Sequence, residues 1–201
     1  MEIVVSSKSW KSDLAAWIVT RMLRPRVLLL AILLIAAACL SHPVSVADDS
    51  WIWNAVAIVG LVFTFRLQDD LADIETDRHR HPDRILCRSA FTKQLLLASQ
   101  CFRLVAGAAI LLRFGGWSLM TFSVLILILN AWYQDSFRLR HPIGNAAVVL
   151  LKYPCFLIIT VWNSGWPAFA VATGVYLLLF TIEWRAIHSE SNQNANTTSD
   201  Q

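Results

Sequence analysis

The stretch that decides the fold reads Trp51-Ile-Trp-Asn-Ala-Val-Ala-Ile-Val-Gly-Leu-Val-Phe-Thr-Phe65, and it continues directly into Arg66-Leu-Gln-Asp-Asp-Leu-Ala-Asp-Ile-Glu-Thr-Asp77. The first part is an apolar run of the kind that crosses a membrane, whereas the second part is rich in carboxylates. A helix that carries both parts places acidic side chains where the helix leaves the membrane. The sequence therefore predicts a membrane protein with a polar site at one end of a membrane helix.

The composition supports the membrane assignment over the whole chain. Of 201 residues, 56% are hydrophobic and 15% are charged, and the mean hydropathy is +0.53. A soluble globular protein carries about 25% charged residues. The net charge of +3 is too small to indicate nucleic acid, so we expect no nucleic-acid partner. The four cysteines are far apart and do not show the spacing of metal ligands, which indicates packing roles.

The apolar runs predict an all-α polytopic membrane helical bundle with about six transmembrane helices. Residues 1–20 form an N-terminal segment of patchy apolarity, and residues 188–201 form a polar tail that we expect to be disordered. The transmembrane domain of residues 21–187 contains the acidic motif at 66–88. We expect its helices at 27–40, 51–65, 95–112, 117–132, 143–162 and 168–184.

The distribution of basic residues predicts the orientation independently of any motif. Almost every Lys and Arg lies in segments that share one side of the membrane when the N-terminus is inside. Positively charged loops remain on the cytoplasmic side. We therefore expect an integral membrane protein with both termini and the acidic segment in the cytoplasm, in the cell or inner membrane if the protein is bacterial.

The acidic segment has a regular spacing that indicates a cation site. On a helix, Asp69, Asp73 and Asp77 are four residues apart, and Asp70 is expected on the same face. Like charges at this spacing repel one another, and Mg²⁺ is commonly held by carboxylates together with the phosphates of a substrate. The alternative is a solvated loop whose acids pair with its own bases. The arginines that border the aspartates can bind the phosphate groups of a metal-bound polyphosphate. They are Arg66, Arg78, Arg80, Arg84 and Arg88.

Two further groups are expected on the same side. The loop from Tyr133 to Asn145 contains Arg138 and Arg140, which can hold phosphate oxygens or can simply signal topology. Glu183, near the end of the sixth helix, can supply another carboxylate or can pair with Arg185.

The acidic segment and the basic loop after it resemble a motif of a known protein family. Residues 69–77 follow the pattern D-D-x-x-D-x-x-x-D and precede a basic loop, which resembles the first aspartate-rich motif of the UbiA family of intramembrane prenyltransferases. The entry to the first helix at Arg21 to Pro25 and the loop from Tyr133 to Gly144 are also similar to that family, so the resemblance extends to about Glu190.

The resemblance implies a helical bundle that binds an isoprenyl diphosphate through Mg²⁺ at its cytoplasmic mouth. The isoprenyl tail would lie in an apolar tunnel, and the isoprenyl group would pass to an aromatic or other lipophilic acceptor. Asp70, Asp73 and Asp77 would be catalytic. The implied metal ligands are Asp69, Asp70, Asp73, Asp77 and Glu183, and the implied diphosphate contacts are Arg84, Arg88, Tyr133 and Arg138.

The sequence also has features that favour other functions. The chain has fewer expected helices than the family typically has, and only Glu183 stands for the second motif. These features favour a catalytically inactive or accessory membrane protein of the same family, or an oligomer or partner chain that completes the bundle. A CDP-alcohol phosphotransferase is disfavoured because residues 70–77 contain no glycine. A transporter is disfavoured because only Gln100 and Arg103 are polar near the bilayer midplane.

Overall fold

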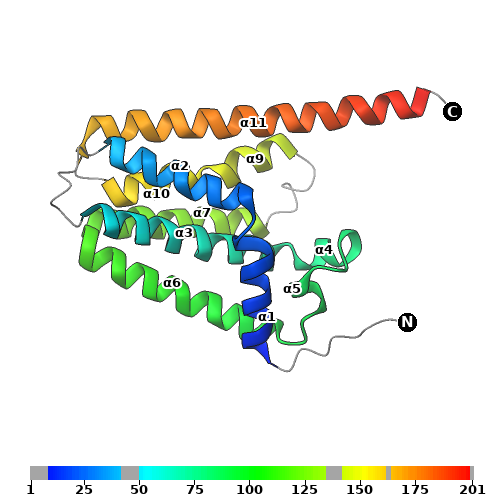
Figure 1. Cartoon of the computed structure of the whole chain (residues 1–201), viewed down its shortest axis with the longest axis horizontal. Coiled ribbons are helices and arrows are strands. Elements are labelled where there is room, and N and C mark those ends of the chain that lie inside the picture. The colour runs from blue at the N-terminus through cyan, green and yellow to red at the C-terminus, as the bar shows by residue number, and fades with distance from the viewer. Residues whose placement is uncertain (1–8, 42–49, 135–141, 162–163, 200–201) are drawn as a thin grey trace.

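The computed structural model describes residues 9–41, 50–134, 142–161 and 164–199, and this part of the chain is all-α, without strands. Most of the long helices run side by side, and α1 stands across one end of the bundle (Figure 1). The elements are α1 (Trp10–Trp17), the π-helix η1 (Ile18–Met22), α2 (Pro25–Ser41), α3 (Ser50–Ala72), α4 (Ile74–Arg80), α5 (Ile85–Arg88), α6 (Thr92–Phe114), α7 (Gly116–Gln134), α9 (Pro142–Leu150), α10 (Lys152–Val161) and α11 (Trp166–Ser199).

The number of membrane spans agrees with the sequence prediction in its coarse form. In the part of the chain that the structure describes, five helices or helix pairs are long and apolar enough to cross a membrane, and a sixth is obtained if the bent pair Trp10–Met22 and Pro25–Ser41 is one span. Large apolar side chains point outward from the bundle, as expected for helices that face lipid. These are the features of an integral membrane protein. Examples of the outward-facing side chains are Leu29, Leu104, Leu112, Leu127 and Trp166.

The helix α10 lies at the centre of the packing, where it contacts α2, α3, α7 and α11. Its side chains Phe156 and Leu157 are fully buried. The ring of Phe65 on α3 lies 5.2 Å from Phe156 and 6.0 Å from Phe122 on α7, between ring centroids. Aromatic packing therefore joins α3, α7 and α10. The turn from α6 into α7 is made by Gly115, whose φ of +88° favours glycine.

The described part of the N-terminal segment is helical. Residues expected to be a patchy lead form α1 and η1, and Ser9 caps α1 by accepting a hydrogen bond from the Ser12 backbone N–H at 3.3 Å. The helices on the two sides of residues 23–24 meet at 74°. Because Trp17 is fully buried against the bundle, α1 and η1 belong to the folded domain.

Two other boundaries differ from the sequence prediction. The fifth span is broken at Leu151 into α9 and α10, because Pro154 has no N–H to donate to the carbonyl of Leu150 and its ring crowds that carbonyl. The helix α11 continues to Ser199, where a disordered tail from His188 was expected. No glycine or proline follows Gly174, so no residue of that kind interrupts the helix.

Candidate functional site

The end of α3 carries Asp70, whose carboxylate is held by the N-terminal helices. Arg21 donates to both of its oxygens, from Nε to Oδ2 at 2.9 Å and from Nη2 to Oδ1 at 2.7 Å. The indole Nε1 of Trp17 donates to Oδ2 at 2.9 Å, and Nη2 of Arg66 lies 3.8 Å from Oδ1. Three residues from two segments thus stabilise a carboxylate that is only 8% exposed.

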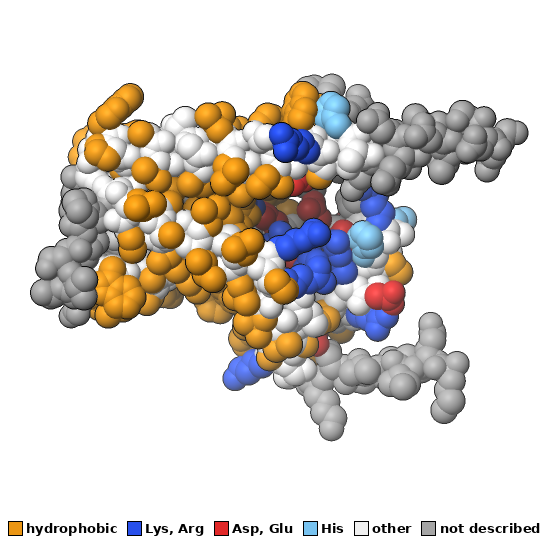
Figure 2. Space-filling model, turned by 45° about the horizontal axis from the view of Figure 1, so that its top comes forward, with side chains coloured by type: hydrophobic (Ala, Val, Ile, Leu, Met, Phe, Trp, Pro, Cys, Tyr) orange, Lys and Arg blue, Asp and Glu red, His pale blue; other side chains and the backbone are white. Residues whose placement is uncertain are grey.

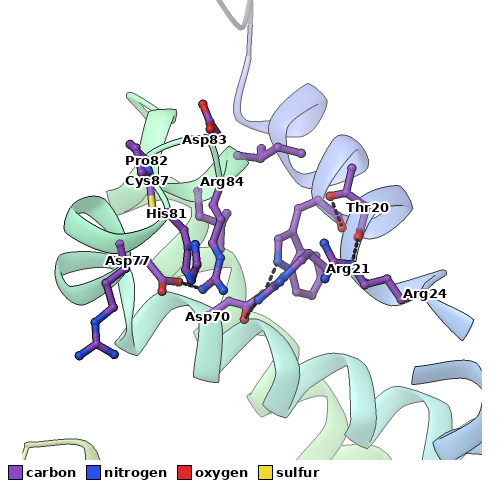
Figure 3. Close-up of a pocket in the computed structure, with 14 residues that line it drawn as sticks. Thr20, Arg21, Arg24, Asp70, Asp77, His81, Pro82, Asp83, Arg84 and Cys87 are labelled. Carbon is purple, nitrogen blue, oxygen red and sulfur yellow. Dashed lines mark hydrogen bonds and ion pairs between the residues drawn. The ribbon is translucent and has the colours of Figure 1, made fainter. Parts of the chain in front are cut away.

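A second ion pair faces Asp70 across a pocket of about 540 Å³. Asp77 on α4 accepts a hydrogen bond from Arg84, and both residues line this pocket with Asp70 and Arg21. Figure 3 shows the two pairs approaching from different walls. We call this space the polar pocket. Its ionisable lining residues, apart from the cysteine, are Arg21, Arg24, Asp70, Asp77, Arg80, His81, Asp83 and Arg84.

Asp69 turns away from the polar pocket and into the bundle. It accepts hydrogen bonds from Lys152 at the start of α10 and from the hydroxyl of Tyr133 at the end of α7. The side chain of Lys152 is 2% exposed and lies within the candidate span Ile143–Val161. A buried ammonium group needs a partner, and Asp69 provides the opposite charge.

A layer of polar side chains that includes Arg103 continues beside this buried ion pair. Nε2 of Gln68 donates to Oδ1 of Asn130 at 2.8 Å, and Nη1 of Arg103 lies 3.4 Å from the same oxygen. The layer links α3, α6 and α7.

Figure 2 shows acidic side chains recessed in a hollow beside a cluster of lysine and arginine side chains.

The expectation that four aspartates share one face is wrong. Neighbouring residues on an α-helix are about 100° apart, so Asp69 and Asp70 face different sides of α3. The helix also ends at Ala72, and Asp73, with φ −94° and ψ 1°, separates it from α4. The structure therefore brings Asp70 and Asp77 to the polar pocket, while Asp69 lies inside the bundle.

Other predicted site residues lie outside the polar pocket. The side chain of Arg88 is 61% exposed and donates to Asp83, and Tyr133 contacts Asp69 within the bundle. Glu183 is exposed on α11 and does not line the pocket among the described residues. Arg138, together with Arg140, lies outside the residues that the structure describes.

The donor set fits a metal ion only if the ion is shared with a bound anion. Within the described ranges, no group of three or more His, Cys, Asp or Glu side chains is arranged to hold a metal. The polar pocket nevertheless contains the carboxylates Asp70 and Asp77. Mg²⁺ commonly takes one or two carboxylates, with the remaining ligands from water and phosphate oxygens. In the structure both carboxylates are paired with arginines, Asp70 with Arg21 and Asp77 with Arg84.

An apolar groove lies on the other side of η1. It has a volume of about 980 Å³ and is lined by residues of η1, α2, α3 and α6. From η1, Ile18 and Met22 face this groove, whereas Thr20 and Arg21 face the polar pocket. The five-residue π-helix therefore forms the boundary between a charged pocket and an apolar groove.

Cys87 lies in the wall of the polar pocket, with its Sγ 3.9 Å from the carbonyl oxygen of Ile74. Burial raises the pKa of its thiol, and the negative charge of Asp77 raises it further. Because the thiolate is the reactive form, Cys87 is a weak nucleophile at neutral pH.

Sequence reasoning missed the contribution of the N-terminal helix and of Lys152. Trp17 and Arg21 are four residues apart and thus share one helix face, which is a pattern visible in the sequence. Lys152 stands inside an apolar span, and a charged residue in such a position indicates a buried partner. Neither pattern identifies which aspartate each cation binds.

Comparison with known proteins yields no match: no family model, no curated protein and no solved structure is similar to this chain. The likeness to UbiA prenyltransferases therefore remains an expectation drawn from the aspartate motif. An all-helical chain with five or six candidate membrane spans is what the structure supports.

Proposed function

We propose that this protein is a Mg²⁺-dependent membrane prenyltransferase of UbiA type. It transfers an isoprenyl group from an isoprenyl diphosphate to an aromatic or other lipophilic acceptor. The observation that carries the proposal is the position of η1, which has the polar pocket on one side and the apolar groove on the other. A ligand with an anionic head and a long apolar tail is complementary to such a pair of sites.

The head group of the ligand lies in the polar pocket. Arg21, Arg24, Arg80 and Arg84 supply positive charge, and an arginine side chain matches phosphate oxygens in a bidentate geometry. Asp70 and Asp77 are the residues that would hold Mg²⁺ in this pocket. When bound, the metal neutralises charge that grows on the leaving diphosphate.

The isoprenyl tail lies in the apolar groove. Side chains from four helical segments line it, and several of them also face outward toward lipid, including Leu28, Val56, Val105 and Leu112. A groove with this lining accommodates a hydrocarbon chain without unpaired polar groups. The lipophilic acceptor reaches the same region from the bilayer.

The proposed orientation places the polar pocket on the cytoplasmic side, with both termini there. This orientation follows from the excess of lysine and arginine near that end of the helices. It gives a water-soluble or membrane-bound diphosphate direct access to the pocket. This arrangement does not require the predicted Mg²⁺ ligands Asp73 and Glu183. It also does not require the predicted diphosphate contacts Arg88, Tyr133 and Arg138.

A second candidate is a non-catalytic membrane protein of the same family that binds an anionic amphiphile. The pairing of both acids in the polar pocket favours it, because Asp70 already contacts Arg21 and Asp77 already contacts Arg84. In that case binding does not need a metal. An accessory subunit of this kind binds its ligand in the polar pocket and the apolar groove and catalyses no reaction.

The test is equilibrium binding of a non-hydrolysable isoprenyl diphosphate analogue to the detergent-purified protein, in Mg²⁺ and in EDTA. We expect binding that requires Mg²⁺ and falls at least about tenfold in the Asp70→Asn/Asp77→Asn double variant, because both proposed metal ligands are lost. Glu75→Gln is the matched control, since Glu75 is exposed on α4 and pairs with Arg78 outside the pocket.

The outcomes separate the two candidates. Tight binding that is equal in Mg²⁺ and in EDTA supports the non-catalytic protein. Absence of binding over a range of isoprenyl lengths contradicts both. A Mg²⁺-dependent complex then justifies a search for transfer to aromatic acceptors.

A further inference from the structure

The helices α1 and η1 run across the direction of the membrane helices. The chain turns by 74° between Trp10–Met22 and α2. The 17 residues of α2 rise by about 26 Å, so α2 alone covers most of a hydrocarbon core of about 30 Å. Figure 1 shows α1 crossing one end of the bundle. The segment α1–η1 therefore lies close to the plane of the membrane and does not need to cross it.

The two pockets indicate the depth of this segment. The π-helix η1 separates the polar pocket from the apolar groove. Charged side chains are costly in the hydrocarbon region, whereas lipid-facing apolar side chains belong there, so this boundary marks the membrane surface. Figure 2 shows lysine and arginine side chains gathered toward one end of an otherwise apolar surface. The exposed side of α1–η1 thus lies at the level of the lipid head groups.

The exposed side of this segment carries apolar and basic side chains. Val19 is 62% exposed and Leu23 is 56% exposed. Lys11 and Arg26 are exposed before and after them in the chain, and neither forms an ion pair with another described residue. The one acid in residues 9–41, Asp13, is buried. The exposed side therefore has positive charge that no neighbouring acid of this segment compensates.

We propose that Lys11, Val19, Leu23 and Arg26, which we call the basic face, bind anionic phospholipids of the surrounding leaflet. The two basic side chains contact the phosphate groups, and the two apolar side chains enter the adjoining acyl-chain region. Interfacial helices bind through apolar area and electrostatic attraction together, and one lysine or arginine near an anionic surface contributes about fivefold in affinity.

The basic face is separate from the site of the proposed function. Arg21 and Arg24 line the polar pocket and are not part of the basic face. Binding of phospholipid at Lys11 and Arg26 requires no metal, no diphosphate and no catalysis. The proposal can therefore hold whether or not the protein is a prenyltransferase.

The test measures which lipids surround α1 in nanodiscs made of equal amounts of phosphatidylcholine and phosphatidylglycerol. A fluorophore on Ala15→Cys reports from the basic face, because Ala15 is exposed and lies one helical turn from Lys11 and from Val19. The four native cysteines are replaced by alanine. Bromine on the acyl chains of one lipid at a time quenches the fluorophore. We expect phosphatidylglycerol to be enriched around the fluorophore by at least about fivefold.

Variants of the basic residues test the source of this enrichment. Lys11→Gln/Arg26→Gln removes both charges and should abolish most of it, whereas Lys11→Arg/Arg26→Lys keeps both charges and should preserve it. The matched control is Arg78→Gln/Arg185→Gln, which removes two exposed charges from α4 and α11 and should leave the enrichment unchanged. Added salt should lower the enrichment in the parent, because the contacts are exposed.

Several results overturn the inference. Equal quenching by the two brominated lipids in the parent shows that the basic face does not select anionic lipid. Quenching by neither lipid shows that this face lies in water. An equal loss in the control variant shows an effect of net charge and not of these residues. Should Lys11→Gln/Arg26→Gln not fold, the inference is overturned if neither single variant lowers the enrichment.

Discussion

Asp69 and Asp70 are neighbours on α3, and each is 8% exposed, yet their surroundings differ completely. Asp69 faces the bundle interior and binds Lys152 and Tyr133, whereas Asp70 faces the polar pocket and binds Arg21 and Trp17. Lys152, which pairs with Asp69, is buried within a candidate membrane span, whereas Arg21, which pairs with Asp70, lines the polar pocket. The helix face, and not the degree of exposure, decides whether an acid is structural or available to a ligand.

The largest effect is expected at the interior pair. Lys152→Met leaves the charge of Asp69 buried with only the hydroxyl of Tyr133, which should lower the free energy of unfolding by about 3–5 kcal/mol. Thermal unfolding in detergent, followed by monodisperse recovery on a sizing column, measures the loss. The Asp69→Asn/Lys152→Met double variant should regain most of it. A single variant as stable as the parent contradicts the structural role of this pair.

A smaller effect is expected where Asp70 meets α1. Trp17→Phe keeps an aromatic ring against Phe63, whose centroid is 5.6 Å away, and removes the donor to a charged carboxylate. The expected loss is about 2 kcal/mol of unfolding free energy. Trp10→Phe, at the other end of α1, is the control for changing a tryptophan in the same helix. Equal losses in the two variants show that the indole N–H contributes nothing.

The pair between Asp77 and Arg84 should contribute still less to stability, because the side chain of Arg84 is 33% exposed and water screens the charges. Arg84→Gln should cost at most about 1 kcal/mol. The same variant should bind the isoprenyl diphosphate analogue more weakly. If its unfolding free energy falls as far as that of Lys152→Met, the pocket pair is structural and the contrast with Asp69 disappears.

The smallest expected effect concerns the chemistry of Cys87. Its raised pKa reduces the thiolate fraction at pH 8, so alkylation by a maleimide should be slower than for free cysteine and should still accelerate above pH 9. A protein with alanine at positions 39, 101 and 155 isolates this thiol. Adding Asp77→Asn removes a negative neighbour, which lowers the pKa and speeds the reaction. If Asp77→Asn leaves the alkylation rate of Cys87 unchanged, the charge of Asp77 does not raise the pKa of this thiol.

Hydropathy predicted most of the fold because long apolar helices have few alternatives in a bilayer. The spans that begin near Trp51, Thr92 and Trp117 lie close to their expected positions. Hydropathy did not predict α1 and η1, whose roles depend on Trp17 and Arg21, because these two side chains reach Asp70 on a distant helix. It also did not predict the break at Leu151, because the hydropathy of residues 143–161 as a whole is that of one continuous span.

The acidic segment was identified from the sequence, although its internal arrangement was not. Spacing places Asp69 and Asp73 on one stripe only if the helix is continuous, and α3 ends at Ala72. Which cation pairs with Asp69 depends on how α10 packs against α3, and this is a tertiary contact between residues 83 positions apart. Local periodicity contains no information about such a contact.

The buried Lys152 has a consequence for biogenesis. A lysine at the centre of an inserting helix costs about 2.5–3.5 kcal/mol on translocon scales. Its partner Asp69 precedes it in the chain, as does Tyr133, which donates to the same carboxylate, so both leave the ribosome before α10 does. The counter-charge is thus already synthesised when the costly span arrives, and the order of residues in the sequence favours late docking of α10 onto helices that are already in the membrane.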